Sequence, residues 1–214
     1  MASNKKNEEP FDITMIAILD YSVGNVDAVQ NMLRKLGVAS TISSDPGQIR
    51  TASKLVLPGV GAFDAAMEAL QHFGLTESVR SFASSGRPLL GICLGAQLLL
   101  SSSEEGTLPG FGFIDGNCKK FDGINPLRIP HMSWSEVSFT KFHPITNFEE
   151  SAPRFYFVHS YHMVCNDTAS ILGTSHYGYE FASAVYRDNI IGVQFHPEKS
   201  HKYGAQFLSN FAKL

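Results

Sequence analysis

The first half of the chain alternates short apolar runs with segments whose apolar residues recur at helical spacing. The run Ile13–Leu19 is almost continuously apolar, which is typical of a buried parallel strand. Asn25 then stands where a helix cap is expected, and apolar residues follow at helical spacing until Gly37. We expect Pro58 and Gly59 to break the third strand. The same criteria predict strands at Val38–Ser43, Lys54–Leu57 and Pro88–Ile92, and helical segments at Phe63–Phe73, Leu75–Ala83 and Gly95–Leu100.

The second half is rich in Phe, Tyr, His and Gly and shows short alternating segments instead. Strands are predicted at Arg154–Val158, Phe181–Tyr186 and Ile190–Phe195, and a closing helix at Lys202–Phe211. Strands that alternate with helices favour a parallel sheet covered on both faces. We therefore predict an α/β fold with a mostly parallel sheet, helices on both faces, and an added antiparallel part in the second half. No linker divides the chain, so we expect one domain over residues 13–214 after a frayed or disordered tail at residues 1–12.

The chain has 214 residues, of which 43% are hydrophobic and 17% charged, as in an ordinary globular protein. The net charge of −3 offers no electrostatic footprint for nucleic acid. No apolar run reaches the ~18 residues of a membrane helix. The polar N-terminus also lacks the apolar core of a secretion signal, so we expect a cytoplasmic protein without membrane contact. No His and Cys residues have the spacing of metal ligands, and we expect neither a metal nor a cofactor.

The three cysteines, Cys93, Cys118 and Cys165, are odd in number and widely spaced, which argues against a disulfide framework and favours a reducing compartment. Only Cys93 has a context that indicates chemistry, because in Gly91-Ile-Cys-Leu-Gly-Ala-Gln97 a buried strand ends and a helical pattern begins at once. This is the pattern of a nucleophile elbow, in which a strained turn exposes the nucleophile and glycines allow its neighbours to crowd together. A helix N-terminus also favours thiolate over thiol, and the amide of Leu94 would point toward a developing oxyanion.

A cysteine nucleophile requires a histidine base, and among the eight histidines His196 has the most informative surroundings. A predicted strand ends just before it, and Pro197 and Glu198 follow. Pro197 keeps this segment extended, and residues two apart on an extended segment face the same side. Glu198 can therefore accept a hydrogen bond from one ring nitrogen while the other nitrogen faces Cys93, which is the logic of a catalytic triad.

A glycine-rich turn, Leu57–Ala62, follows the third predicted strand. Its glycines free backbone amides to face a ligand, as an oxyanion hole requires. The turn lacks the G-x-G-x-x-G spacing and the lysine of a phosphate-binding loop, so nucleotide binding is not expected here.

Together and in this order, these elements resemble the class I (triad) glutamine amidotransferases, and among them the glutaminase subunits of imidazole glycerol phosphate synthases. The resemblance runs from about Ile16 to the C-terminus. It implies the flavodoxin-like fold of that class. Its motifs are Asp20-Tyr-Ser-Val-Gly-Asn25, Pro58-Gly-Val-Gly-Ala-Phe63, Gly91-Ile-Cys-Leu-Gly-Ala-Gln-Leu-Leu99, Glu104-Glu-Gly106, Phe157-Val-His-Ser-Tyr161 and Phe195-His-Pro-Glu-Lys-Ser200.

By this resemblance, Cys93 attacks the side-chain amide of glutamine, His196 protonates the departing ammonia and later activates water, and Glu198 orients His196. The products are glutamate and ammonia. The family's oxyanion-stabilising groups match the amide of Leu94 and the turn formed by Gly59, Val60 and Gly61. The residues that match its glutamine-binding positions are Gln97, Glu105, Ser160 and Tyr161.

The resemblance also implies a partner. Ammonia released into water would be protonated and lost as a nucleophile, and the family passes it instead to a separate (β/α)₈ cyclase subunit, with which it forms a heterodimer in histidine biosynthesis. Trp134, the only tryptophan, and Lys199 match positions near that partner. The resemblance further implies little glutaminase activity from the isolated chain.

One motif departs from the usual pattern, because the family reads P-H-x-G-W-N where this chain has Pro130-His-Met-Ser-Trp-Ser135. The two serines leave open a second interpretation, in which the same chemistry feeds ammonia to a sugar amidotransferase in surface-polysaccharide biosynthesis. A third interpretation is a non-catalytic regulatory module on the same fold, against which the intact set of Cys93, His196 and Glu198 argues. A fourth is a cysteine peptidase, which the residues matched to glutamine binding disfavour.

Overall fold

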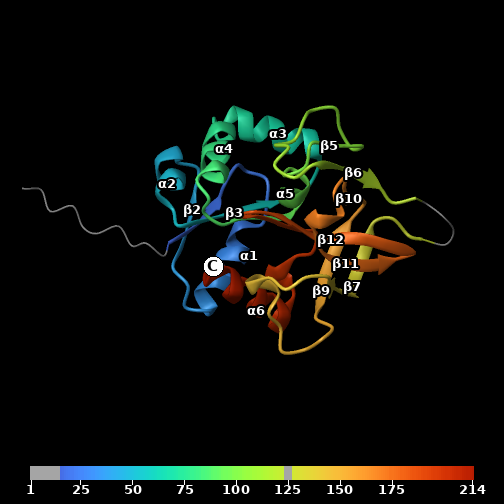
Figure 1. Cartoon of the computed structure of the whole chain (residues 1–214). Coiled ribbons are helices and arrows are strands. Elements are labelled where there is room, and N and C mark those ends of the chain that lie inside the picture. Colours follow the sequence, from blue (N-terminus) through green and yellow to red (C-terminus); the bar gives the residue numbers. More distant parts are fainter. Residues whose placement is uncertain (1–14, 123–126) are drawn as a thin grey trace, which may run out of the picture.

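The computed structural model describes residues 15–122 and 127–214, and Figure 1 shows how its elements are arranged. The tail expected at residues 1–12 lies outside the described residues, as do the first residues of the strand expected from residue 13. The strands are β1 (Ile16–Leu19), β2 (Ser40–Ser43), β3 (Lys54–Gly59), β4 (Leu89–Cys93), β5 (Ser102–Ser103), β6 (Gly116–Lys120), β7 (His131–Glu136), β8 (Ser138–Phe139), β9 (Arg154–His159), β10 (Tyr161–Cys165), β11 (Ile171–Tyr177), β12 (Tyr179–Arg187) and β13 (Ile190–Val193). The helices are α1 (Val26–Lys35), α2 (Pro46–Thr51), α3 (Phe63–His72), α4 (Thr76–Ser84), α5 (Leu94–Gln97) and α6 (His201–Ala212), with 3₁₀ turns η1 (Pro144–Thr146), η2 (Thr168–Ser170) and η3 (Pro197–Lys199).

Eleven of the described strands form one mixed sheet, ordered β2-β1-β3-β4-β13-β12-β10-β6-β5, with β11 paired to β12 and β8 paired to β11. The strands from β2 to β13 in this order are parallel, whereas β12, β10 and β6 join by antiparallel pairing. Numbered by their own succession, the parallel strands follow the order 2-1-3-4-5 of flavodoxin-like sheets. Strands β7 and β9 form a separate antiparallel pair. The predicted α/β fold, with its antiparallel part in the second half, is confirmed.

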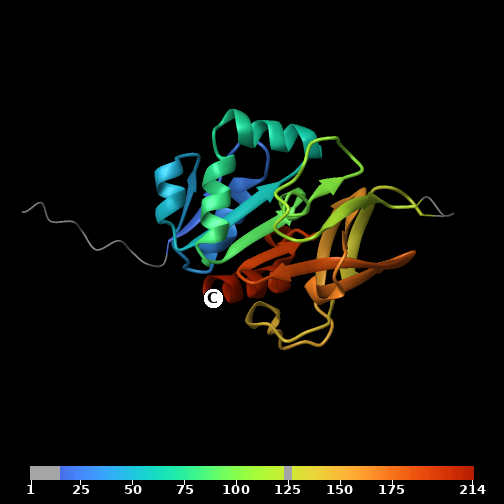
Figure 2. The same cartoon turned by 45° about the horizontal axis from the view of Figure 1, so that its top comes forward.

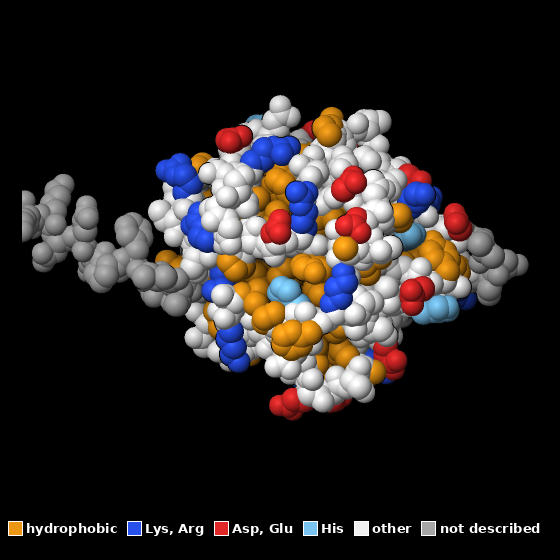
Figure 3. Space-filling model, in the orientation of Figure 1, with side chains coloured by type: hydrophobic (Ala, Val, Ile, Leu, Met, Phe, Trp, Pro, Cys, Tyr) orange, Lys and Arg blue, Asp and Glu red, His pale blue; other side chains and the backbone are white. Residues whose placement is uncertain are grey.

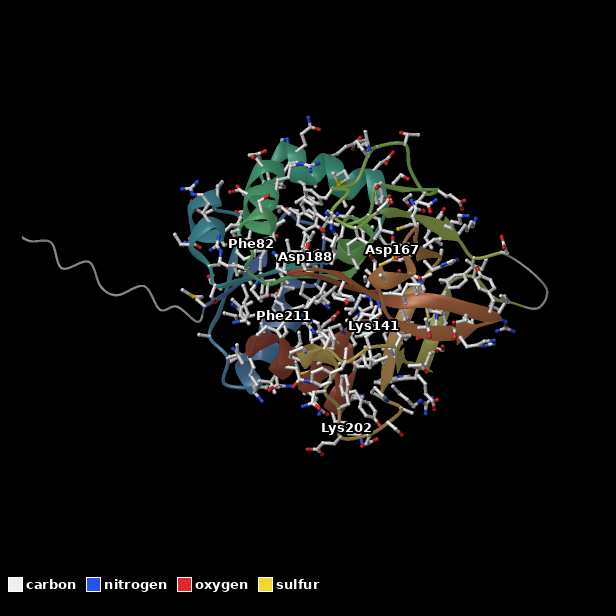
Figure 4. All side chains as sticks on the ribbon, in the orientation of Figure 1. Phe82, Lys141, Asp167, Asp188, Lys202 and Phe211 are labelled. Carbon is white, nitrogen blue, oxygen red and sulfur yellow. The ribbon has the colours of Figure 1, made fainter. Side chains whose placement is uncertain are left out.

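Two hydrophobic cores lie on the two faces of the sheet, because successive residues of a strand point to opposite sides. In β1, Ala17 packs into one core and Ile18 into the other. Helices α2, α3 and α4 cover the first face, and α1 and α6 cover the second (Figures 1 and 2). Phe82 of α4 and Phe211 of α6, labelled in Figure 4, are fully buried, one in each core.

Strand β3 continues through Pro58 and Gly59, where we expected a break. Strand β1 pairs with β3 only as far as Val56, whereas β4 pairs with it to the end, with Gly59 opposite Cys93. Beyond Val56, the side of β3 that faced β1 is free of pairing, so the N–H that proline lacks is not needed there. The expectation was wrong because it took no account of which neighbours the strand has.

Helix α5 is a single turn, shorter than the helical segment expected over Gly95–Leu100. The carbonyl groups of Leu98, Leu99 and Leu100 accept hydrogen bonds from the backbone of residues 111–114. Those carbonyls are the acceptors that a further helical turn would have used. The loop therefore ends the helix early and packs against the elbow.

Helix α2 was not predicted from the sequence. Its start follows ordinary capping chemistry, because the Asp45 side chain accepts from the backbone N–H of Gln48 at 2.8 Å and Pro46 occupies the first turn. Only Ile49 is buried on this short helix, so its sequence shows no apolar periodicity. Without that periodicity, the sequence analysis predicted no element at these residues.

The described part of the chain has no helix that is both long and apolar enough to cross a bilayer. On the face shown in Figure 3, basic and acidic side chains are interspersed, and hydrophobic side chains gather across the middle.

The elbow between β4 and α5 brings backbone segments very close together. A Cβ added at Gly95 would lie 1.9 Å from the carbonyl oxygen of Leu57, and one added at Gly91 would lie 2.7 Å from the carbonyl oxygen of Gly95. These neighbours are backbone atoms within the sheet and its elbow, so they cannot swing aside as a flexible side chain would. The expectation that glycines permit crowding around the nucleophile is confirmed.

We predict that Gly95→Ala lowers the free energy of unfolding by about 3 kcal/mol or more, because the added methyl group overlaps the Leu57 carbonyl. Gly86→Ala is the control, since no atom lies within 4 Å of a Cβ built there and only its φ of +77° opposes the change. That backbone strain costs about 1–2 kcal/mol. Urea unfolding followed by circular dichroism measures both variants, and equal losses would contradict the crowding argument.

Candidate active site

A cavity of about 310 Å³ lies at the carboxyl ends of the parallel strands, beside the end of β4. Open α/β sheets bind their ligands at this edge, and small-molecule sites typically measure about 300–1,000 Å³. Among the described residues, no three His, Cys, Asp or Glu side chains are placed to hold a metal ion. The predicted site residues that line the cavity are Val60, Gly61, Cys93, Leu94, Gln97, Glu105, Ser160, Tyr161, His196 and Lys199. Those that do not line it are Gly59, Trp134 and Glu198.

Cys93 ends β4 and has a φ of 54°, in the left-handed region that few residues other than glycine adopt. The strained turn expected of a nucleophile elbow is therefore confirmed, at a cost of about 1–3 kcal/mol. The sulfur is largely buried and has two hydrogen-bond partners among the described residues: the Gln194 amide nitrogen at 3.7 Å and the Val158 carbonyl oxygen at 4.0 Å. Helix α5 is only one helical turn long, so its dipole is weak. The strained backbone at Cys93 therefore does more than the helix dipole to direct the sulfur into the cavity.

His196 follows the end of β13, and Glu198 lies in η3. Nδ1 of His196 donates to Oε1 of Glu198 at 2.7 Å, and both side chains are only 2% exposed. Because a carboxylate can only accept, this bond fixes the proton on Nδ1. Nε2 has no hydrogen-bond partner in the described part of the chain, and His196 lines the same cavity as Cys93. The predicted bond from His196 to Glu198 is present in the structure.

The electrostatic surroundings of His196 favour its protonated form. Burial lowers the pKa of His196, but its interactions with Cys93 and Glu198 outweigh burial and raise that pKa to about 10. The ring can therefore take up a proton beside the sulfur and hold it. This is the property that a general acid needs when it protonates a leaving group.

The residues matched to glutamine binding form one wall of the cavity. Gln97 donates from Nε2 to the carbonyl oxygen of Tyr161 at 3.0 Å and to Oε1 of Gln194 at 3.1 Å. Both of its amide protons are thus engaged, so Gln97 offers a ligand only its oxygen. Glu105 accepts from the backbone N–H of Phe63 at 2.9 Å, which ties it to the start of α3. This wall therefore presents acceptors to whatever occupies the cavity.

The turn after β3 is held from below by Tyr21, which the sequence analysis did not single out. Tyr21 is fully buried, and its hydroxyl donates to the carbonyl oxygen of Pro58 at 2.6 Å. Burial raises the pKa of Tyr21, so its hydroxyl keeps its proton and remains a donor. Gly59 lies opposite Cys93 in the sheet, and Val60 follows it into the cavity wall.

Trp134 and Lys199, the residues matched to the partner surface, lie on different elements. Trp134 of β7 is 37% exposed and stacks on His201 of α6, with ring centroids 5.3 Å apart and planes 1° from parallel. Lys199 lines the cavity, with Nζ 5.9 Å from the centre of the Tyr156 ring. Their contact with a partner stays a prediction.

The two serines of the unusual motif face inward and begin a hydrogen-bonded chain. The hydroxyls of Ser133 and Ser135 lie 2.8 and 3.0 Å from Nε2 of His131. Nδ1 of His131 is 3.1 Å from Nε2 of His159, whose Nδ1 is 2.7 Å from the carbonyl oxygen of Tyr161. Because a carbonyl can only accept, His159 carries its proton on Nδ1, and His131 must then donate from its own Nδ1. Both rings are neutral, and each proton has one fixed place.

The residues that the sequence analysis missed share one property, which is that they act on a distant segment. Tyr21 bonds a residue 37 positions away, His131 one 28 positions away and Gln194 one 101 positions away. One available signal was Gln194 itself, a polar residue within the apolar strand predicted at Ile190–Phe195.

Comparison with known proteins identifies relatives of this chain. The family model "Glutamine amidotransferase class-I" matches residues 17–214. The chain is 49% identical to the imidazole glycerol phosphate synthase subunit HisH 2 of Methanococcus maripaludis, over 93% of this chain and 99% of that one. It is also 49% identical to the imidazole glycerol phosphate synthase subunit HisH of Sulfurimonas denitrificans, over 93% and 98%.

Solved structures share the fold at lower identity. The structure of PurLQS from Thermotoga maritima has a TM-score of 0.72 at 16% identity and covers 93% of this chain and 97% of that one. A glutamine amidotransferase from Thermotoga maritima has a TM-score of 0.61 at 15% identity, with 94% and 83% covered. These two likenesses support the fold alone.

We predict that the free energy of unfolding falls as the pH is lowered from 6.5 toward 4. Burial lowers the pKa of His131 to about 4 and that of His159 to about 3. In the unfolded chain both take up protons near pH 6.5, so the unfolded state is protonated first. The stability that these groups contribute is present above pH 6.5 and is lost as the pH falls toward their folded-state pKa values.

Urea unfolding at pH 7, 6 and 5 measures this dependence. His159→Gln removes one such group and should reduce the slope by up to about 1.4 kcal/mol per pH unit. His72→Gln, at an exposed histidine of α3, is the matched control and should leave the slope unchanged. If His159→Gln leaves the dependence of the free energy of unfolding on pH unchanged, the conclusion that His131 and His159 are neutral in the folded protein is contradicted.

Proposed function

The chain belongs to the glutamine amidotransferase class-I family and, within it, to the imidazole glycerol phosphate synthase HisH subunits, and we propose that Cys93, His196 and Glu198 carry out its glutamine hydrolysis. It is the glutamine-hydrolysing enzyme subunit of that synthase, which serves histidine biosynthesis. The observation that carries the proposed roles is the arrangement at one cavity. A strained cysteine lines it together with a histidine whose other nitrogen is bonded to a buried glutamate.

The proposed reaction follows from the hydrogen-bonding capacities of these three groups. The Cys93 sulfur attacks the side-chain carbonyl carbon of glutamine, and Nε2 of His196 takes the thiol proton. The C–N bond then breaks, His196 returns the proton to the nitrogen, and ammonia leaves a thioester behind. Water, deprotonated by His196, attacks the thioester and releases glutamate. Glu198 keeps the proton of the ring on Nδ1, so that Nε2 is free for each transfer.

The negative oxygen of the tetrahedral intermediate requires donors that are already in place. We assign this role to the backbone N–H of Leu94 and to the Gly59–Gly61 turn. Their support is positional, because Gly59 lies opposite Cys93 in the sheet and Val60, Gly61 and Leu94 line the cavity. The bond from Tyr21 to Pro58 holds the base of the turn.

We assign the amino-acid end of glutamine to the acceptor wall of the cavity. An α-ammonium group donates three hydrogen bonds, and the free oxygen of Gln97 and the carboxylate of Glu105 are suitable acceptors. Ser160 and Tyr161 line the same wall and complete the proposed glutamine site. The substrate is then held with its side-chain amide toward Cys93.

We propose that ammonia passes to a (β/α)₈ cyclase subunit, which forms a heterodimer with this chain. The support is the relatives' names, which describe a subunit of a synthase, and a surface suited to a partner near the cavity. Met132 and Val60 are exposed apolar side chains, Val60 lines the cavity itself, and Trp134 lies two residues beyond Met132 on β7. We place Trp134 and Lys199 at this interface.

The serines that suggested a sugar amidotransferase partner have an internal explanation. Their hydroxyls bond His131, so they change the inside of β7 more than its exposed face. The relatives named as synthase subunits favour the histidine pathway. Capture of a sugar amidotransferase by the full chain would overturn this choice of partner.

We predict that Cys93→Ser lowers glutamine hydrolysis to roughly one thousandth or less, and that Glu198→Gln lowers kcat by roughly tenfold or more. The first variant replaces the sulfur nucleophile, and the second removes the charge that stabilises the protonated histidine. Glutamate release by the complex measures both. Cys165→Ser, at a half-buried cysteine away from the cavity, is the control and should retain full activity. Wild-type kcat from Glu198→Gln would remove Glu198 from the mechanism.

We predict that the isolated chain hydrolyses glutamine at least about tenfold more slowly than the complex with its cyclase. The physical reason is coupling between sites, since binding of the partner selects the arrangement of the Gly59–Gly61 turn in which its donors face the oxyanion. Steady-state glutamate release with and without a stoichiometric cyclase measures the difference. Equal rates would show that the turn is already in its active form.

A further inference from the structure

We propose that Gln194 is a further functional residue of this site, whose side-chain amide donates to the Cys93 sulfur and holds it as an anionic acceptor toward the cavity. The inference rests on the proposed role of Cys93 as the nucleophile. The sequence motifs that indicate the function include no role for Gln194, which was predicted only as part of the strand before His196.

The position of Gln194 is rigid. It follows β13 directly, it is fully buried, and its backbone N–H donates to the carbonyl oxygen of Ser183 at 2.9 Å. Its Nε2 lies 3.7 Å from the Cys93 sulfur, within hydrogen-bond reach of the larger sulfur atom. A fully buried side chain just beyond a central strand is closely packed, so this contact does not depend on a ligand.

The hydrogen-bond network decides which end of the Gln194 amide faces the sulfur. The carbonyl oxygen of Tyr161 can only accept, so the group that Gln97 turns toward it must be its nitrogen. The second proton on that nitrogen then points to Gln194, so the atom of Gln194 that accepts it must be the oxygen. The nitrogen of Gln194 is left for Cys93. His159 donates to the same carbonyl of Tyr161 and so holds the first link in place.

The two hydrogen-bond partners of the sulfur favour different protonation states: the Val158 carbonyl favours the thiol, and the Gln194 amide favours the thiolate. A thiol can donate to the carbonyl oxygen of Val158 at 4.0 Å, whereas a thiolate has no proton to donate and is repelled by that oxygen. The N–H of Gln194 bonds a thiolate more strongly than a thiol, because hydrogen bonds to charged acceptors are roughly twice as strong. When the sulfur is a thiolate, the hydrogen bond from Gln194 therefore offsets its repulsion by the Val158 carbonyl.

The test measures how fast iodoacetamide alkylates Cys93 at pH 7 in the full wild-type chain and in its variants. Mass spectrometry of the peptide that contains Cys93 gives the rate. Gln194→Met keeps an unbranched side chain of similar length but has no N–H, and we expect the rate to fall about tenfold. Gln206→Met is the matched control, because Gln206 lies on α6, bonds the Asn147 carbonyl and does not line the cavity. We expect its rate to equal that of the wild type. An unchanged rate in Gln194→Met would overturn the proposal.

A second measurement uses the native side chain, in case Gln194→Met does not fold. In chain labelled with ¹⁵N-glutamine, the side-chain NH₂ signals of Gln194 should move when Cys93 is replaced in Cys93→Ala, while those of Gln206 should not. Signals of Gln194 that stay in place would overturn the proposal. Glutamate release by the complex is scored separately, with a lower kcat and a smaller change in KM expected for Gln194→Met. Suppose that the wild-type complex hydrolyses no glutamine, while Gln194→Met still slows the alkylation of Cys93. That outcome would refute the proposed function but would support the contact between Gln194 and the sulfur.

Discussion

The close approach of α5 to β3, with no side chain between them, determines the position of Cys93, the proposed nucleophile. Gly95 lies directly over the Leu57 carbonyl, and Gly91 leaves room for the turn above it. Between these two glycines, Cys93 adopts the left-handed region. The sheet below therefore bears the strain of the elbow, and the sulfur has a fixed place before any ligand arrives.

The second half of the chain surrounds this fixed sulfur with polar groups. His159 of β9, Tyr161 of β10 and Gln194 just after β13 are linked through hydrogen bonds that include Gln97. Further along the same segment, His196 bonds Glu198. A buried polar network of this kind is stable only when every donor meets an acceptor, so each member restricts the others. The result is a site whose protons, as well as its atoms, have assigned places.

Local patterns were sufficient to predict the parallel strands, most helices, and the roles proposed for Cys93, His196 and Glu198. Each of these depends on residues close together in the chain. The continuation of β3 through Pro58, the early end of α5, and the contacts of Tyr21 and Gln194 depend on which segments become neighbours. No spacing within a segment encodes those neighbours, and an inward-facing serine on β7 is indistinguishable in sequence from an outward-facing one.

Strand β13 is made late in synthesis and yet lies in the middle of the sheet, between β4 and β12. Until the ribosome has released it, no strand joins the parallel half to the antiparallel half, and His196 has no place beside the elbow. A growing chain therefore carries Cys93 on an unfinished sheet, without the histidine that we propose as its base. On the proposed mechanism, a chain that lacks this last strand cannot hydrolyse glutamine, because the segment that completes the sheet also carries His196.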